Sequence, residues 1–170
     1  MKHRFEYLDS NDVESIEGLS ETLVKVNRSA AVVKGGRRFS FSALSVIGNR
    51  GGVVGYGFGK ARQVPGAIEK AAKDGRKHLM RVPIDEDGAI PHEVTGLYCG
   101  AVVRMLPASA GTGIIACQSV RAVAEMAGIR NILTKSYGST NPVNLVKATL
   151  HALSQLRTAE QVRELRGVTL

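Results

Sequence analysis

One short stretch of the chain has glycine at every second position. There glycine alternates with larger apolar residues, in the order Val54, Gly55, Tyr56, Gly57, Phe58 and Gly59. Successive side chains of a β-strand point to opposite faces, so a strand built this way has one bare face. Strand glycines cost stability and usually mark the close approach of another backbone or a ligand. We expect the neighbour of Gly55 and Gly57 to be a helix predicted over residues 65–80.

Strand and helix patterns follow one another in two blocks. The first block predicts strands over residues 22–33, 39–47 and 53–60 and a helix over residues 65–80. A change of apolar parity inside residues 39–47 indicates a bulge or burial on both faces. After an acidic turn at residues 85–88, the second block predicts strands over residues 94–98, 101–106 and 131–136 and helices over residues 114–127 and 143–156. Gly128 is expected to cap the first of these helices, and Asn141 with Pro142 to begin the second. The fold class is therefore α+β, with a β-β-β-α block before a β-β-α-β-α block.

Positive charge is concentrated in one part of the chain. Residues 1–22 carry two basic and six acidic side chains, residues 23–83 carry thirteen and two, and residues 84–170 carry eight and seven. A local excess of this size indicates a polyanionic partner. Residues 1–20, which are acidic and lack periodicity, are expected to form a flexible tail.

Cations and glycines coincide in two predicted turns. Lys34, Arg37 and Arg38 flank Gly35 and Gly36 in one turn, and Arg50 precedes Gly51 and Gly52 in the other. Basic turns on a small antiparallel sheet, beside a helix with lysines at helical spacing, suit phosphate contacts on structured RNA. We therefore expect RNA backbone to approach these turn glycines.

Nucleotide-binding loops are not supported by the glycine-rich segments. A phosphate loop ending at Lys60 would need glycine where Val54 stands, and Ser or Thr where Ala61 stands. The loop over residues 107–113 is similar to the phosphate loop of galactokinase-type small-molecule kinases. Ile114 and Ile115 follow it in place of hydroxyl residues, however, and no metal-binding acid occurs between Glu93 and Glu125.

Metal binding and catalysis lack candidate residues. Cys99 and Cys117 have no ligand spacing around them and are expected to be small buried thiols in a reducing compartment. The four histidines are scattered and lack the partners that a catalytic base requires. We expect no enzyme activity, cofactor, metal or small-molecule substrate. Because no apolar run approaches membrane-spanning length, we also expect a soluble, cytoplasmic chain.

Four segments together resemble the family of the fifth protein of the bacterial small ribosomal subunit. They are KGGRRFSF at residues 34–41, GYGFGKARQVP at 55–65, PASAGTGIIA at 107–116 and YGSTNP at 137–142. The resemblance implies an N-terminal domain like a double-stranded-RNA-binding domain over residues 21–84. It also implies a C-terminal α+β domain with a left-handed β-α-β crossover over residues 92–160. Residues 1–20 and 161–170 would be tails.

The resemblance also implies a place and partners. Such proteins bind small-subunit ribosomal RNA where the head meets the body, contact the fourth and eighth small-subunit proteins, border the messenger RNA entry channel and influence decoding accuracy. The turn that matches Lys34, Gly35 and Gly36 lies near the spectinomycin site in this family. Ala110 stands where an acid is common, and the turn of Arg50 to Val53 departs from the usual one.

Two sets of candidate site residues follow from the charges and the resemblance. The RNA-binding candidates are Lys25, Asn27, Arg28, Lys34, Gly35, Gly36, Arg37, Arg38, Arg50, Lys60, Arg62, Lys135, Tyr137, Ser139, Thr140 and Asn141. The protein-interface candidates are Gly111, Thr112, Gly113 and Arg121. Two other functions remain open: a free-standing double-stranded RNA-binding module, and a small-molecule kinase related to the C-terminal fold.

Overall fold

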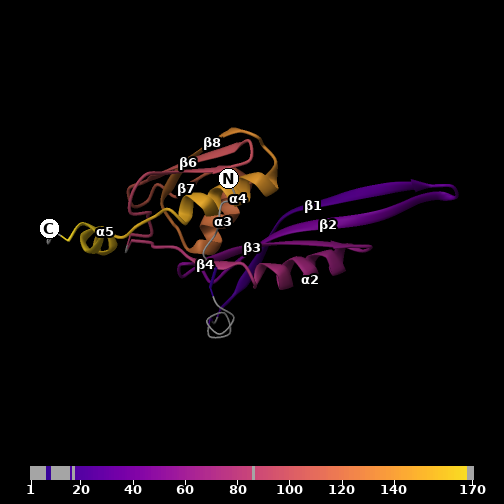
Figure 1. Cartoon of the computed structure of the whole chain (residues 1–170), viewed down its shortest axis with the longest axis horizontal. Helices are drawn as coiled ribbons and strands as arrows, with labels where there is room; N and C mark the ends of the chain where they lie inside the picture. Colours follow the sequence, from indigo (N-terminus) through magenta and orange to yellow (C-terminus); the bar gives the residue numbers. More distant parts are fainter. Residues whose placement is uncertain (1–6, 9–15, 17, 86, 168–170) are drawn as a thin grey trace.

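A computed structural model describes residues 7, 8, 16, 18–85 and 87–167 of the chain. Its first sheet is antiparallel, with strands in the order β1 (Ser20–Val33), β2 (Gly36–Gly48), β3 (Val53–Ala61) and β4 (Leu79–Arg81). The helix α2 (Val64–Gly75) lies along one face of this sheet (Figure 1). Both faces of β2 are buried over residues 43–48, which is one of the two explanations given for its change of apolar parity. The bulge of this sheet lies instead in β1, between Leu23 and Lys25.

The predicted helix over residues 65–80 is too long. Helix α2 ends at Gly75, where the amides of Lys77 and His78 turn back onto the carbonyls of Asp74 and Gly75. Leu79 then enters β4, whose residues pair with β3. The first block is therefore β-β-β-α-β, because Leu79 and Met80 are buried by a strand and not by the helix.

At Gly57 the bare face of β3 is covered by helix α2, as the sequence predicts. A Cβ atom at Gly57 would collide with the backbone of Ala71 and Gly75 in α2, and one at Gly59 with the backbone of Ala67 and Ala71. The glycines thus let the helix axis approach the sheet. Gly55 differs, because the backbone beside it belongs to His78, just before β4, and not to the helix.

The second sheet has the strand order β5, β6, β8, β7. Its strands are β5 (Val94–Tyr98), β6 (Ala101–Pro107), β8 (Ile132–Gly138) and β7 (Ile114–Ile115). The helices are α3 (Gln118–Ala127), α4 (Pro142–Leu153) and α5 (Ala159–Arg166). Strand β7 is parallel to β8 and α3 joins them, which is the β-α-β unit that the family resemblance implies. The helix predicted over residues 114–127 therefore begins four residues late, after a two-residue strand.

Helix ends follow the predicted capping residues. Gly128 ends α3 with a left-handed φ of 96°, and Asn141 begins α4 by accepting a hydrogen bond from the amide of Val143. Helix α5 begins with a capping box of Thr158 and Gln161, so residues expected to form a C-terminal tail contain a helix.

The two blocks share one apolar core. Leu44, Val46 and Val54 of the first sheet pack in the same cluster as Val123 of α3 and Val146 of α4. At the edge of this core, the ammonium of Lys147 in α4 donates to the Tyr98 hydroxyl at 3.2 Å and lies 5.4 Å from the ring centre of Tyr56 in β3. Each block has its own periodicity, as predicted, yet neither buries its apolar face alone.

The segment predicted to be a flexible tail is packed where the structure describes it. Leu8 donates its amide to the carbonyl of Leu79 at 2.8 Å, and Leu8, Ile16 and Leu19 pack against the cluster that contains Leu79. The Tyr7 ring lies 5.0 Å from the ring of His78, and burial raises the pKa of the Tyr7 hydroxyl. Residues 1–6, 9–15 and 17, which carry most of the acidic charge, lie outside the described residues.

Candidate RNA interface

The outer halves of β1 and β2 form a hairpin arm, defined here as residues 25–41. The strands run in register from the pair Lys25 and Leu44 to the pair Val33 and Gly36 at the tip. Every residue from Asn27 to Phe39 is exposed, so no core lies under this part of the sheet. Figure 1 shows the arm extending well beyond the end of α2 and away from the second sheet. Between Asn27 and Phe39 the arm presents both of its faces to solvent.

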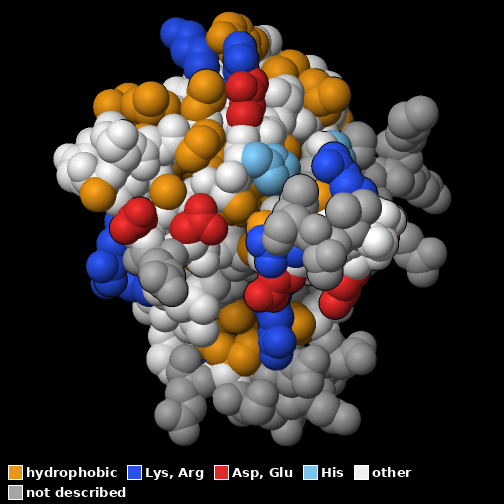
Figure 2. Space-filling model, turned by 90° about the vertical axis from the view of Figure 1, so that its left-hand side faces the viewer, with side chains coloured by type: hydrophobic (Ala, Val, Ile, Leu, Met, Phe, Trp, Pro, Cys, Tyr) orange, Lys and Arg blue, Asp and Glu red, His pale blue; other side chains and the backbone are white. Residues whose placement is uncertain are grey.

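The arm carries only positive charge. Lys25, Arg28, Lys34, Arg37 and Arg38 lie on it, and no Asp or Glu occurs between Glu21 and Glu69. Within the described chain, the ion pairs are those of Glu93 with Arg104 and Asp74 with His78, both outside the arm. Figure 2 shows the opposite end of the molecule, where basic and acidic side chains are interspersed. The arm's cations are therefore available to an external polyanion.

Strand alternation divides the sequence candidates between two faces of the arm. Ala43 packs on α2, which defines the helix-side face, and Leu44 packs in the shared core, which defines the domain-side face. Arg28 and Arg37 lie on the helix-side face, while the domain-side face carries Lys25, Asn27, Arg38 and Lys60. Lys34, Gly35 and Gly36 form the tip, and Arg62 lies exposed just past β3. The structure thus brings together ten of the predicted RNA-binding residues on the arm and at the end of β3 beside it: Lys25, Asn27, Arg28, Lys34, Gly35, Gly36, Arg37, Arg38, Lys60 and Arg62.

The turn at residues 49–52 does not belong to this group. The amide of Arg50 donates to Met126 at 3.0 Å, and the amide of Gly52 donates to Ala127 at 2.8 Å. Gly128 has no room for a Cβ because the carbonyl of Arg50 lies against it. The turn therefore packs on the C-terminal end of α3. Gly52 adopts a left-handed φ of 93° there, which favours glycine whether or not RNA is bound.

Arg50 and Arg121 line one groove. This groove is about 530 Å³ in volume and is also lined by Glu125 and Arg130. Arg50 is predicted to bind RNA and Arg121 to lie at a protein interface, and both line this groove. Three basic residues and one acidic residue thus line the groove.

The loop over residues 107–113 uses its amides internally. The Asn131 carboxamide oxygen accepts hydrogen bonds from the amides of Gly111 and Gly113, both at 3.1 Å, and its nitrogen donates to the carbonyl of Asp87 at 2.9 Å. Asn131 is buried, and sequence reasoning missed it because nothing local links it to a loop about twenty residues away. Thr112 at the loop's tip is exposed, and its amide donates to the carbonyl of Ser109 at 3.1 Å.

The remaining RNA candidates lie on the second block. Lys135 and Tyr137 are exposed on the face of the second sheet that α4 does not cover. Thr140 is exposed before α4. Ser139 and Asn141 have structural roles there, since Ser139 accepts from the Asn141 amide at 3.3 Å and Asn141 caps α4. Of these five predicted RNA-binding residues, three are therefore exposed and two stabilise the start of α4.

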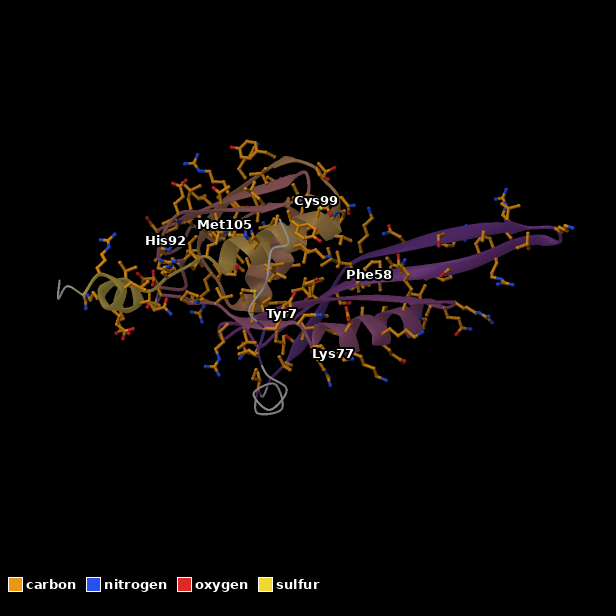
Figure 3. The ribbon with its side chains drawn as sticks, in the orientation of Figure 1. Tyr7, Phe58, Lys77, His92, Cys99 and Met105 are labelled. Atoms are coloured by element: carbon orange, nitrogen blue, oxygen red, sulfur yellow. The ribbon has the colours of Figure 1, made fainter. Side chains whose placement is uncertain are left out.

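Both cysteines are exposed, and the expectation that they are buried is wrong. Cys99 lies in the turn between β5 and β6 (Figure 3), with a φ of 50°, and Cys117 is the residue before α3. Within the described residues, no three His, Cys, Asp or Glu side chains are grouped so that they could hold a metal ion. In the same part of the chain, no helix is long and apolar enough to cross a membrane.

Comparison with known proteins gives a consistent result over both blocks. The family model described as "Ribosomal protein S5, N-terminal domain" matches residues 19–83, and the model described as "Ribosomal protein S5, C-terminal domain" matches residues 96–166. The chain is 56% identical over 161 residues to the small ribosomal subunit protein uS5 of Rhodopirellula baltica, covering 94% of this chain and 90% of that protein. It is 52% identical over 157 residues to the protein of the same name from Tolumonas auensis, covering 92% and 94%.

These matches and the α+β fold define the class of protein. It is a structural constituent of the small ribosomal subunit, which associates with ribosomal RNA and other ribosomal proteins. The chain belongs to the ribosomal protein S5 family, whose members are structural and not enzymes. Its membership of this family places it on the ribosome in the cytoplasm.

Proposed function

We propose that the hairpin arm is the main contact of this chain with small-subunit ribosomal RNA, at the junction of the head and body. The observation that carries the proposal is the arm itself, exposed on both faces with five cations and no carboxylate. Most hydrogen bonds to nucleic acid go to phosphate and sugar, and arginine can hold two phosphate oxygens at once. The lysines and arginines on both faces let the arm lie between two stretches of RNA backbone.

The shared core gives this contact a mechanical role. Because the first sheet and helices α3 and α4 pack in one cluster, the arm is rigidly connected to the second block. A protein can shift the conformation of its partner only through contacts that differ between the partner's states. The chain then stabilises one orientation of the head by holding RNA with the arm while its second block contacts neighbours. Those neighbours include the fourth and eighth small-subunit proteins, and the messenger RNA entry channel lies nearby.

Directed cleavage of RNA can test the arm contact in assembled subunits. A hydroxyl-radical-generating chelate would be attached to Ser29→Cys on the arm or to Glu160→Cys on α5, after Cys99 and Cys117 are replaced by serine. Both native cysteines are exposed, so their removal should cost less than about 0.5 kcal/mol of unfolding free energy. We expect strong cleavage of ribosomal RNA from position 29, in both head and body, and weak cleavage from position 160. The reverse pattern would place the RNA contact elsewhere.

Arg121 should contribute to a protein contact and not to the fold. Its side chain is exposed in the groove beside Arg50 and Arg130, and Thr112 lies on the loop that precedes α3. We propose that this end of the second block contacts the fourth small-subunit protein and so influences decoding accuracy. An exposed charge usually contributes less than about 1 kcal/mol to stability, so its loss leaves the chain folded.

Cells that carry Arg121→Leu should misread codons at an altered frequency while their small subunits assemble normally. The reason is that the interface is weakened but no buried contact of this chain is lost. Misreading is measured with a reporter, and assembly by sedimentation. Arg163→Leu, an exposed arginine on α5, is the matched control. Unchanged accuracy with normal assembly would rule out the interface role, whereas an assembly defect would make Arg121 structural.

The alternative functions have weaker support. A phosphate loop at residues 107–113 would need free amides, but those of Gly111 and Gly113 are bonded to Asn131. A free-standing RNA-binding module would need a first block that folds alone, yet its apolar face is completed by the second block.

A further inference from the structure

The arm carries an aromatic side chain that no core covers. Phe39 is 42% exposed, and the Arg28 guanidinium lies over its ring, 4.6 Å from the centroid. The phosphate contacts proposed above require neither the Phe39 ring nor its pairing with the Arg28 guanidinium. Figure 3 shows side chains standing out from both sides of the arm near its tip, well away from the second sheet.

The helix explains why the neighbouring aromatic is covered and Phe39 is not. Phe41 is two residues away on the same face and packs against Ala67 and Ala71 of α2. Phe39 is the next residue outward on this helix-side face, and its cross-strand partner is the small Ala30. The ring therefore faces solvent beyond the N-terminal end of the helix. Burial within the chain does not account for a phenylalanine at this position.

The charge around Phe39 selects one kind of occupant. Phe39 stands among five cations with no acidic side chain on the arm, which disfavours a basic protein surface and favours a polyanion. Aromatic rings and arginine guanidinium planes are the two groups on which proteins stack unpaired RNA bases. A ring already paired with a guanidinium offers both in one place.

We propose that Phe39 and Arg28 form a stacking platform for an unpaired base of the ribosomal RNA. This inference rests on the proposed contact between the arm and RNA, and adds to it a contact with a base in addition to those with phosphates. The base stacks on the face of the ring that Arg28 leaves open or on the outer plane of the guanidinium. The platform gives the arm a fixed position along the RNA, which phosphate contacts alone do not specify.

The absence of tryptophan from the chain provides a direct probe. Phe39→Trp introduces a single tryptophan that keeps an aromatic surface at the platform. We expect its fluorescence to be quenched when a small-subunit ribosomal RNA transcript binds the full chain, because stacked bases quench indole. Leu165→Trp, at a site 70% exposed on α5, is the matched control and should not be quenched. A blunt RNA duplex should quench neither variant.

Affinity separates the platform from the electrostatic contact. Phe39→Leu should bind the transcript about tenfold more weakly with an unchanged salt dependence, and Phe39→Trp should restore affinity. The inference is overturned if position 39 shows no quenching while RNA binds, or if Phe39→Leu binds as tightly as the native chain. Equal quenching by the duplex would exclude an unpaired base. If the arm did not contact RNA at all, replacing the arm's cations would leave the salt dependence of RNA binding unchanged. That result is distinct from any outcome at position 39.

Discussion

Replacing Lys34, Arg37 and Arg38 together by alanine should weaken binding to small-subunit ribosomal RNA about a hundredfold at about 200 mM salt. Each cation that neutralises a phosphate adds about 0.9 to the slope of log affinity against log salt. If the native chain neutralises about six phosphates, its affinity should fall roughly a thousandfold between about 50 and 200 mM salt. With three contacts gone, the fall should be only about fortyfold. Binding titrations at several salt concentrations measure both slopes.

Three arginines at the other end of the molecule provide the control for this experiment. Arg157, Arg163 and Arg166 are all exposed, and replacing them by alanine removes the same charge. If this control variant lowers the slope as much as the arm variant, the effect is one of net charge and not of the arm. Neither variant should unfold the chain, because none of the six side chains is buried.

Gly57→Ala should lower the free energy of unfolding by about 3 kcal/mol, the largest stability effect that we expect from a single methyl group. The new Cβ would overlap the carbonyl oxygen of Ala71 and the amide of Gly75, both of which are backbone atoms. Neither can move aside unless α2 moves away from the sheet, which opens the packing of Ala67 and Ala71. For a chain of this size, such a loss lowers the melting temperature by about 10 °C.

Gly35→Ala is the matched control for the glycine substitution. It makes the same chemical change at the tip of the arm, where nothing lies within 4 Å of the new atom. Its melting temperature should stay within a few degrees of the native value, roughly 2 °C. Equal melting temperatures for the two variants would mean that α2 does not need the bare face of β3.

The sequence patterns predicted those elements whose formation depends on residues close together in the chain. The long strands β1, β2 and β3, the C-terminal end of α3 and the start of α4 follow from alternation and capping residues, which act within a few positions. Strands β4 and β7 were missed because they are three and two residues long. A pattern that short carries no period, and both strands exist only because a partner strand is already in place.

The candidate site was predicted unevenly for the same reason. The arm's cations were identified from the sequence because exposed charge on a hairpin needs no distant partner. The packing of Arg50 on Gly128 joins the two blocks, and the burial of Asn131 depends on residues about twenty and forty positions away in the sequence. Composition and spacing contain no information about such pairs.

The shared core has a consequence for the newly synthesised chain. Domains generally fold as units, with the N-terminal one first during synthesis. Here the first sheet leaves the ribosome with Leu44, Val46 and Val54 uncovered, since their partners in α3 and α4 are made later. During that interval the nascent protein presents an apolar sheet face beside a highly basic arm. Both surfaces are prone to unwanted contacts, the first with other unfolded chains and the second with any nearby nucleic acid. The protein is thus most vulnerable while the residues between the end of β4 and the end of α4 are being translated, an interval of roughly 4 to 14 seconds at about 5 to 20 residues per second.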